Sequence, residues 1–351
     1  MLILSIDTSC DETSVAITDG STVLANVVAS QIELHKKYGG VFPTVAKQAH
    51  RENIGPCIKA ALKMVNGKWQ MDDIDAIAVT VGPGLAPALE IGINQAKELV
   101  KTHHKKLIGV NHIEGHLLSV LAEPNCRGRK FSAPTIPVLS VVVSGGHSEF
   151  ILLKQIGDYQ KLGQTIDDAA GECLDKVGRL LGLGYPAGAV IEKFAKQGDA
   201  YKYKFPLPMT ESGDFNLSFS GLKTHSKNLI KKLEAEGKLD KQCIYDLAAG
   251  IQQAVIRHIS HKLEKLLLVH PEIREIWLGG GVAANIALRQ ALRKIARKNK
   301  LKFRVPYSKK LCGDNAAMIG VVAHYKYERG ELVQDLSELD RRPNGKIDDP
   351  C

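Results

Sequence analysis

The sequence predicts an α/β protein built from two similar halves. The first hundred or so residues read as three strands, then a helix, a strand, a helix and a strand. The second half opens on a comparable alternation of apolar strands and glycine-rich loops. A chain of 351 residues is also long enough for two domains of ordinary size, each with its own core.

The first predicted domain covers 1–128. Its strands are expected at 2–7, 14–18, 23–28, 74–81 and 107–110. A helical pattern covers 44–65, broken or bent near Gly55 and Pro56, and another helix follows the glycine loop after the fourth strand. The first three strands are close enough in sequence to form an antiparallel meander.

The second predicted domain covers 134–312 and resembles a distant internal duplication of the first. Its strands are expected at 136–143, 149–153, 162–165 and 275–278, its main helices at 170–181 and 243–269, and an amphipathic helix and strand lead to Arg304. A linker at 123–134 is rich in Pro, Asn, Gly and Arg. The segment of about 313–351, with a helical pattern at 315–329, is expected to pack back on the first domain.

Composition favours a globular protein and argues against a membrane-spanning one. The apolar share of 44% and the charged share of 24% are average for globular proteins, and no apolar run is long enough to cross a bilayer. The opening MLILSIDTSC lacks a basic flank and reads as a buried strand, so we expect a cytoplasmic protein with no membrane association. Seven scattered cysteines form no C-x-x-C pair, which favours reduced thiols. The net charge of +9 favours an anionic partner, but it also fits a basic protein that binds none.

Two histidines directly after a predicted strand are candidate metal ligands. His112 and His116 have i,i+4 spacing, which places both imidazoles on one face of a helix. The zinc-protease motif needs Glu immediately after the first His, whereas Ile113 stands there and Glu114 points elsewhere. The plain alternative is a pair of exposed histidines without a role.

Asp314 is the best candidate for a third ligand. Two histidines and one carboxylate form a facial set that leaves coordination positions open, which suits Fe²⁺ and permits Zn²⁺. Asp314 also precedes a predicted helix, so it could instead be that helix's N-cap.

Two glycine loops and one acidic turn are candidate ligand-binding segments. Val143-Ser144-Gly145-Gly146-His147 and Leu278-Gly279-Gly280-Gly281-Val282 follow strands, and glycine allows backbone N–H groups to approach a phosphate or ribose. Ser144 lacks the G-x-S-x-G elbow of a serine nucleophile. The turn at 7–13 holds Asp7, Asp11 and Glu12. These carboxylates serve either as solvated turn residues or, if the turn faces the ligand, as an acid, a base or a ligand for a metal-bound water. A ligand is expected in the crevice between the halves, where open sheets bind nucleotides.

Taken together, these motifs resemble the TsaD family, formerly called the O-sialoglycoprotein endopeptidase family, over nearly the whole chain. The family belongs to the actin, Hsp70 and sugar-kinase superfamily, so the resemblance implies two ribonuclease-H-like domains with a central cleft. Besides the segments above, it includes 30–41, Gly82-Pro83-Gly84-Leu85, 167–172, 218–224 and Asp314-Asn315. The tract 31–46 is similar to the bacterial and organellar branch.

The resemblance implies a transferase that moves threonylcarbamoyl from threonylcarbamoyl-AMP to the N6 amine of adenosine 37 in tRNAs reading codons that begin with adenine. It implies TsaB-like and TsaE-like partners, and one divalent metal held by His112, His116 and Asp314. The family's substrate-binding residues fall on Val142, Val143, Ser144, Gly145, Gly146, Asp175, Gly188 and Asn285. Glu12, or alternatively Asp11, is the candidate acceptor for the proton of the attacking amine.

Some residues depart from the family pattern. Ala187 stands in a usual Pro-Gly-Gly, Glu90 stands where an apolar residue is common, and Asp7 replaces Glu. A second expectation concerns the stretch 289–310, which contains ten basic and no acidic residues and could contact tRNA phosphates, or could be a solvated basic face.

Two rival functions remain: a small-molecule kinase of the same superfamily, and a nucleotide-binding regulatory subunit. The histidine pair argues against a kinase, because magnesium-dependent phosphoryl transfer needs no imidazole ligands.

Overall fold

The structure, a computed structural model, describes residues 1–65, 70–126 and 132–349. The chain forms two compact units. Unit 1 contains 1–133, 156–159 and 305–351, and unit 2 contains 134–155 and 160–304. The expected domain boundary at residue 128 and part of the expected linker lie outside the described residues.

Unit 1 is built on a six-stranded sheet with the order β5-β4-β1-β2-β3-β6. The strands are β1 (Leu2–Asp7), β2 (Glu12–Asp19), β3 (Thr22–Ser30), β4 (Ala76–Gly82), β5 (Lys106–Asn111) and β6 (Glu123–Pro124). The first three form the antiparallel meander expected from the sequence, whereas β1, β4 and β5 are parallel. The carboxyl ends of these three parallel strands therefore lie at one edge, where α/β sheets bind ligands.

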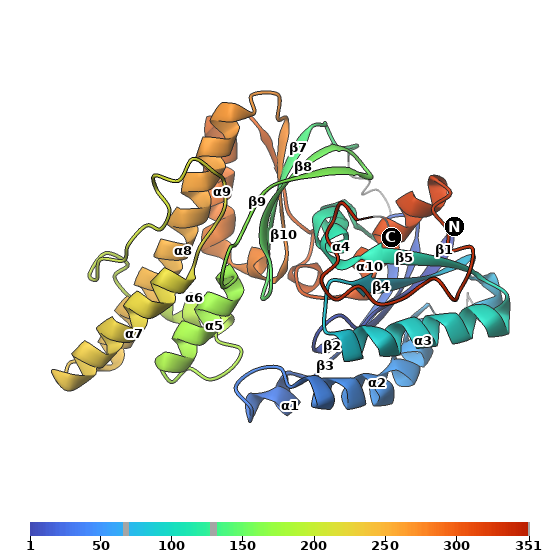
Figure 1. The fold of residues 1–351 in the computed structure, drawn as a ribbon, viewed down its shortest axis with the longest axis horizontal. Coiled ribbons are helices and arrows are strands. Elements are labelled where there is room, and N and C mark those ends of the chain that lie inside the picture. Colours follow the sequence, from blue (N-terminus) through green and yellow to red (C-terminus); the bar gives the residue numbers. More distant parts are fainter. Residues whose placement is uncertain (66–69, 127–131, 350–351) are drawn as a thin grey trace. The chain divides into compact units, whose positions relative to one another are not determined.

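Helices cover the sheet of unit 1, as Figure 1 shows. They are α1 (Ile32–Lys36), α2 (Pro43–Met64), α3 (Ala86–His103), α4 (His112–Leu118) and α10 (Ala316–Glu328), with 3₁₀ turns η1 (Met71–Asp73), η2 (Ser119–Leu121) and η4 (Lys309–Leu311). Leu4 and Ile6 of β1 belong to the apolar core formed with α2 and α3. Ser5, which points to the opposite face, donates a hydrogen bond to the Ala316 carbonyl of α10. Alternation along β1 therefore places Asp7 on the α10 face.

Helix α2 runs through Pro56 as one helix, so the break that was one of the two expected alternatives there, a break or a bend, does not occur. Proline removes one helical hydrogen bond and crowds the preceding turn. Buried side chains on both sides of it, among them Ile54, Cys57 and Ile58, anchor the helix to the core. Tertiary packing therefore outweighs the local preference.

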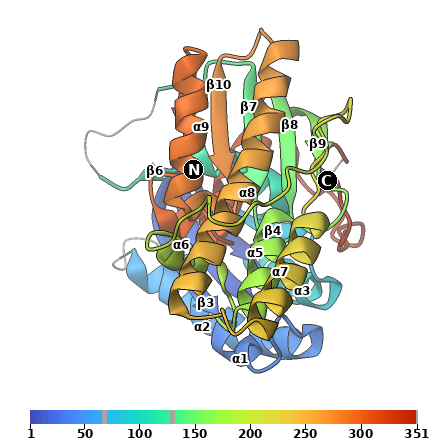
Figure 2. The same ribbon diagram turned by 90° about the vertical axis from the view of Figure 1, so that its left-hand side faces the viewer.

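Unit 2 is built on a five-stranded sheet with the order β11-β10-β7-β8-β9. The strands are β7 (Val138–Val143), β8 (Ser148–Gln155), β9 (Asp158–Gln164), β10 (Glu275–Gly279) and β11 (Lys302–Arg304). The helices are α5 (Ala170–Leu180), α6 (Gly188–Ala195), α7 (Ser220–Ala235), α8 (Lys241–Val269) and α9 (Ile286–Lys298), with a 3₁₀ turn η3 (Gly281–Ala284). Helices α5, α6 and α7 pack against the long α8 (Figure 2).

Without the short edge strand β6 of unit 1, the two sheets have the same strand order. In each, the first strand of the sheet is central, an antiparallel hairpin extends to one side, and two parallel strands extend to the other. This shared order is what a duplicated βββαβαβ segment produces. Among the described residues, no helix combines the length and apolar character that a bilayer span requires.

Candidate metal and substrate sites

The two candidate histidines follow the carboxyl end of β5. Asn111 ends that strand, and its side-chain oxygen accepts hydrogen bonds from the backbone N–H groups of Ile113 (2.8 Å) and Glu114 (3.3 Å). Asn111 is therefore the N-cap of α4, and His112 is the first residue of that helix. This cap fixes the direction in which the imidazole pair projects.

His112, His116 and Asp314 converge in unit 1. Asp314 Oδ1 lies 3.5 Å from His112 Nε2 and 3.2 Å from His116 Nε2. One potential ligand atom from each residue lies within 4.8 Å of the other two. Both imidazoles are buried, and the Asp314 side chain keeps 21% exposure. The group is compact enough to hold one divalent cation, with an open side at the carboxylate.

Asp314 does not serve as the helix cap that the sequence left as an alternative. Asn315 is the N-cap of α10, and its side-chain oxygen accepts a hydrogen bond from the Met318 backbone N–H at 3.2 Å. The Asp314 carboxylate is directed to the histidines instead.

Asp7 supports His112 from the end of β1. Its carboxylate Oδ1 lies 3.7 Å from His112 Nδ1 and accepts a hydrogen bond from the Ser9 backbone N–H. A carboxylate behind a ligating imidazole orients the ring and directs its other nitrogen to the cation. Sequence analysis names Asp7 as a carboxylate of the acidic turn and as a departure from the family pattern, but not as a partner of His112. Its place at the end of a buried parallel strand was a usable signal for that role.

The electrostatics of this group favour positive charge. Burial alone would lower the pKa of His112, but Asp314 and Asp7 outweigh it and raise the pKa to about 10. Burial would raise the pKa of Asp314, whereas the two histidines hold it well below its usual range. Burial and the neighbouring His112 lower the pKa of His116. The carboxylates therefore create a site that stabilises a cation.

Buried polar atoms that lack hydrogen-bond partners also support a cation site here. Within the described chain, His112 Nδ1, both ring nitrogens of His116 and Asp7 Oδ2 are buried without a hydrogen bond of good geometry. Buried polar groups are normally satisfied, so a cluster of unsatisfied imidazole and carboxylate atoms calls for a partner. A divalent metal supplies one for ligands of this type.

Asp11 lies in the turn between β1 and β2, Glu12 is the first residue of β2, and both belong to the same electrostatic group. Burial raises the pKa of Glu12 well above its ordinary value, and the charges of Asp314 and Asp11 raise it further. Asp11 is buried, and its backbone carbonyl accepts a hydrogen bond from Gln31. The acidic turn is therefore part of the surroundings of Asp314 rather than a solvated loop.

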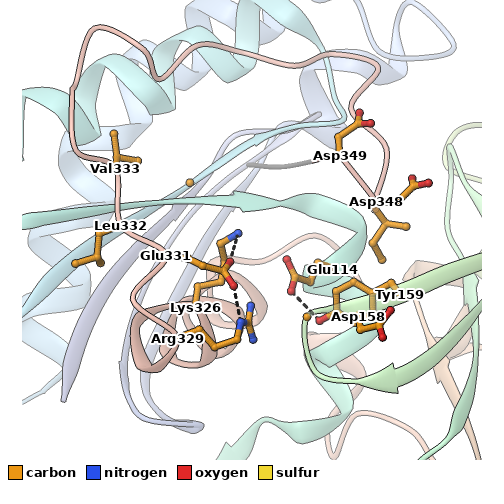
Figure 3. A pocket seen from close by; sticks show the side chains of 13 residues that line it. Glu114, Asp158, Tyr159, Lys326, Arg329, Glu331, Leu332, Val333, Asp348 and Asp349 are labelled. Atoms are coloured by element: carbon orange, nitrogen blue, oxygen red, sulfur yellow. Dashed lines mark hydrogen bonds and ion pairs between the residues drawn. The ribbon is translucent and has the colours of Figure 1, made fainter.

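The opposite side of α4 lines a polar cavity of 630 Å³ (Figure 3). Glu114 projects into it, and its carboxylate accepts a 2.7 Å hydrogen bond from the Tyr159 hydroxyl. Across the cavity Glu331 pairs with Lys326 and Arg329. Glu114 is thus directed away from the metal ligands, as its position in the helix predicted, and it anchors α4 from behind.

In unit 2 the two glycine loops follow neighbouring parallel strands. Val142 at the end of β7 pairs with Gly279 at the end of β10. The loops then pack closely, because a Cβ on Gly280 (φ +89°) would lie 2.3 Å from the Val143 carbonyl oxygen. The Ser144 hydroxyl accepts a hydrogen bond from the His147 backbone N–H and closes its own turn. That structural use of Ser144 agrees with the absence of a nucleophile elbow.

Asp175 and Gly188 meet directly. Asp175 Oδ1 accepts hydrogen bonds from the backbone N–H groups of Ala187 (2.8 Å) and Gly188 (3.0 Å). Ala187 is fully buried, and its methyl group occupies space left by Gly178 of α5, where a Cβ would lie 2.1 Å from the Ala187 Cβ. Gly178 therefore accommodates the departure at Ala187.

Asn285 holds the second glycine loop to the helices. Its side-chain oxygen caps α9 through the Leu288 N–H, and its amide donates to Gln252 Oε1 at 2.7 Å. Glu192 of α6 accepts from the next backbone N–H, that of Ile286. The expected substrate-binding residues of unit 2 thus come from strand ends, loops and helices that hydrogen bonds join at Asp175 and at Asn285. Sequence reasoning missed Glu192 and Gln252, because neither stands in a recognisable motif.

The departure at Glu90 also has a structural explanation. Its carboxylate pairs with Lys47 at 3.0 Å and with Arg341 at 3.3 Å. The residue lies on α3 and links α2 to the C-terminal segment. Glu90 is therefore a surface ion-pair residue within unit 1.

Part of the basic stretch 289–310 makes contacts within the chain. Helix α9 is amphipathic as expected, with Leu288, Leu292 and Ile295 buried. Five basic side chains of the stretch 289–310 have partners within the chain: Arg289 on Ala283, Arg293 over Phe303, Lys298 near Glu264, and Lys302 and Arg304 at Glu275. Its contact with tRNA stays a prediction.

Comparison with known proteins identifies the family. Residues 22–321 match the TsaD family, tRNA N6-adenosine threonylcarbamoyltransferase. A protein of that name from Thermosipho africanus is 43% identical over 348 residues, covering 99% of this chain and all of the relative. One from Crocosphaera subtropica is 44% identical over 336 residues, covering 94% of this chain and 93% of the relative.

Solved structures confirm the predicted fold class. An activator of 2-hydroxyisocaproyl-CoA dehydratase from Clostridium difficile is 14% identical with a TM-score of 0.53, covering 94% of this chain and 97% of its own. Full-length HypF is 14% identical with a TM-score of 0.57, covering 93% of this chain and 46% of its own. At this identity the likeness concerns the fold alone, that of two ribonuclease-H-like domains. The sequence matches show more: the chain is a member of the TsaD family of tRNA N6-adenosine threonylcarbamoyltransferases.

Proposed function

We propose that this chain is the catalytic subunit that transfers the threonylcarbamoyl group from threonylcarbamoyl-AMP to the N6 amine of adenosine 37 in tRNAs reading codons that begin with adenine. Membership of the TsaD family supports the reaction. The observation that carries the catalytic role is the convergence of His112, His116 and Asp314 at the carboxyl edge of the first sheet. Neither a kinase nor a purely regulatory subunit requires that set.

One divalent metal per subunit is the proposed cofactor, with Fe²⁺ favoured and Zn²⁺ possible as the ion that His112, His116 and Asp314 hold. When bound, the metal supplies Lewis-acid polarisation of the carbonyl that is transferred. Asp7 orients His112 from behind, and Glu114 anchors the other side of α4 through Tyr159. The chain therefore preorganises two ligands before the cation binds.

The acidic turn provides the proposed proton acceptor. Glu12, or alternatively Asp11, takes the proton that the adenosine amine loses as it attacks the carbonyl carbon, and AMP leaves with the electrons of the broken acyl–phosphate bond. The electrostatic interaction of Glu12 with Asp314 supports its place near the reacting group.

Unit 2 provides the proposed adenylate site. The loop 142–146 is the proposed phosphate contact, because glycine at positions 145 and 146 lets the backbone approach an anion closely. Asp175 and Gly188 form the proposed ribose contact, and Asn285 fixes the second loop beside the nucleotide. The proposed domains are 1–128, with 313–351 packed on it, and 134–312.

The assembly is proposed to include TsaB-like and TsaE-like proteins and to act in the cytoplasm. The resemblance of the tract 31–46 to the bacterial branch supports these partners.

Reconstitution tests the proposal. Purified chain, both partners, threonylcarbamoyl-AMP and unmodified tRNA should give threonylcarbamoyl-adenosine under metal-replete, anaerobic conditions. An otherwise identical reaction with tRNA carrying guanosine in place of the target adenosine is the control. Lack of modified nucleoside with the wild-type chain, or ATP-dependent phosphorylation of a small molecule instead, would refute it.

A further inference from the structure

A basic groove lies between α5 and α7 of unit 2, which run side by side in Figures 1 and 2. Its cavity measures 530 Å³. Lys176 and Arg179 line it from α5, and Lys223, Thr224, Lys227 and Asn228 line it from α7. Four of the lining side chains are cationic and none is anionic.

Two acidic residues form ion pairs with two of the groove's lysines. Asp168 pairs with Lys176 at 2.8 Å and with Lys223 at 2.6 Å, and Glu172 pairs with Lys176 at 2.7 Å. The hydrogen bonds to Asp168 and Glu172 raise the pKa of Lys176 above its usual range. Four cations against these two carboxylates leave a net positive groove.

The outer part of the groove has fewer internal partners. Lys227 is exposed and makes no ion pair within the described part of the chain. Lys223, Lys227 and Lys231 follow one another at i,i+4 spacing, which sets their Cβ atoms roughly 5–6 Å apart along α7. The hydroxyl of Thr224 and the amide of Asn228 add hydrogen-bond donors to this row.

The groove is close to the proposed adenylate site. Lys176 follows Asp175 directly in α5. The same helix begins against the first glycine loop, where the Gly171 N–H donates to the Ser144 carbonyl. Groove and adenylate site thus share one helix, whose diameter with side chains is about 10–12 Å.

We propose that this groove binds backbone phosphates of the tRNA substrate. The inference rests on the proposed function for the identity of the RNA, and on the groove's own chemistry for the contact. Phosphate contacts need cations and hydrogen-bond donors, which the groove offers. A protein partner would need an apolar interface core, and Leu180 is the one large apolar side chain lining the described groove.

Removing two exposed cations, one from each helix, tests the contact. Arg179→Gln with Lys227→Gln should raise the Kd for unmodified tRNA by about tenfold or more near 0.1 M salt. It should also reduce the slope of log affinity against log salt by about 1.4 to 1.8, because each lost phosphate contact removes about 0.7 to 0.9. Lys227→Arg alone should keep wild-type binding.

The matched control is Lys59→Gln with Lys63→Gln, two exposed lysines of α2 that lie outside the groove. The full-length chain is used throughout, and thermal unfolding checks that each variant is folded. The proposal is wrong if the groove variant keeps wild-type affinity and salt slope, or if the control loses as much affinity as the groove variant.

The tRNA-binding test and the reconstitution test separate claims, so either claim can be overturned without the other. A wild-type chain that binds tRNA through the groove but makes no modified adenosine would overturn the proposed function and leave the groove in place. A chain that modifies tRNA while the groove variant binds it normally would overturn the groove alone. Loss of binding to an acidic protein, with tRNA binding unchanged, would assign the groove to a protein partner.

Discussion

At the residue scale, the candidate metal ligands differ in how far the sequence predicts them, because two are close together in the sequence and the third is distant. The spacing of His112 and His116 is local, so the sequence predicts that they share a helix face. Asp314 is about two hundred residues away, and a sequence pattern alone cannot distinguish a ligand from a helix cap. Asn315 resolves the ambiguity by taking the cap, which leaves the Asp314 carboxylate to face the imidazoles.

Replacing His112 or His116 with Ala should remove bound metal and transfer activity while the fold is kept, because a three-ligand site that loses one imidazole loses most of its affinity. Metal content after anaerobic purification, together with circular dichroism, measures both effects. His103→Ala, on α3, is the control and should retain metal. Full activity in a metal-free double variant would contradict a catalytic role for the cation.

A second prediction at the residue scale concerns the loss of folding stability at low pH. Glu275 is fully buried; burial would raise its pKa, but hydrogen bonds from Arg304, Trp277 and Thr135 lower it to about 2. In the unfolded chain a Glu titrates near about 4.3. The unfolded state therefore binds the proton first, and the stability from this group is present above about pH 4.3 and is lost as pH falls toward 2.

Unfolding of the full chain by denaturant between about pH 6 and 3 should show this loss. Glu275→Gln should be less stable than wild type at neutral pH and should lose less stability on acidification, because it cannot titrate. Equal acid sensitivity in the two proteins would show that other carboxylates account for the effect.

At the scale of elements, period and turn signals predicted most strands of both sheets in their order along the chain, but not the edge strand β6 or the helices α6 and α7. The contacts between elements were harder to predict from the sequence. Nothing local in Tyr159 indicates that its hydroxyl meets Glu114. Likewise, nothing local in Lys176 of α5 or Lys227 of α7 indicates that the two side chains line one groove. Pro56 shows the same limit, since its local preference for a break was overridden by packing of α2 on the core.

The packing of α5 on the loop before α6 gives a coupled prediction. Gly178→Ala should destabilise the chain by about 1–3 kcal/mol, because the new methyl group would overlap that of Ala187. Adding Ala187→Gly should recover most of the loss, and denaturant unfolding measures both. Gly221→Ala on α7, where a Cβ meets nothing within 4 Å, is the neutral control. A double variant no more stable than Gly178→Ala would mean that the overlap is relieved in another way.

At the scale of the whole molecule, the chain distributes its proposed chemistry between two compact units. The three candidate metal ligands and Asp7 belong to unit 1. The glycine loops, Asp175, Asn285 and the basic groove belong to unit 2. The sequence predicted this division through the repeated strand and loop pattern. Each ligand should therefore stabilise mainly the unit that binds it.

That separation predicts how metal changes thermal unfolding. A cation that binds only folded unit 1 stabilises it by RT ln(1 + [M]/Kd), about 2.7 kcal/mol at a concentration of one hundred times Kd. Differential scanning calorimetry of the full chain should therefore show one transition that rises in temperature with added Fe²⁺ or Zn²⁺ and another that does not. His116→Ala should abolish the rise, and the groove variant Arg179→Gln with Lys227→Gln should keep it. If both transitions rise equally, the cation stabilises the two units together, and the assignment of its binding energy to unit 1 alone is wrong.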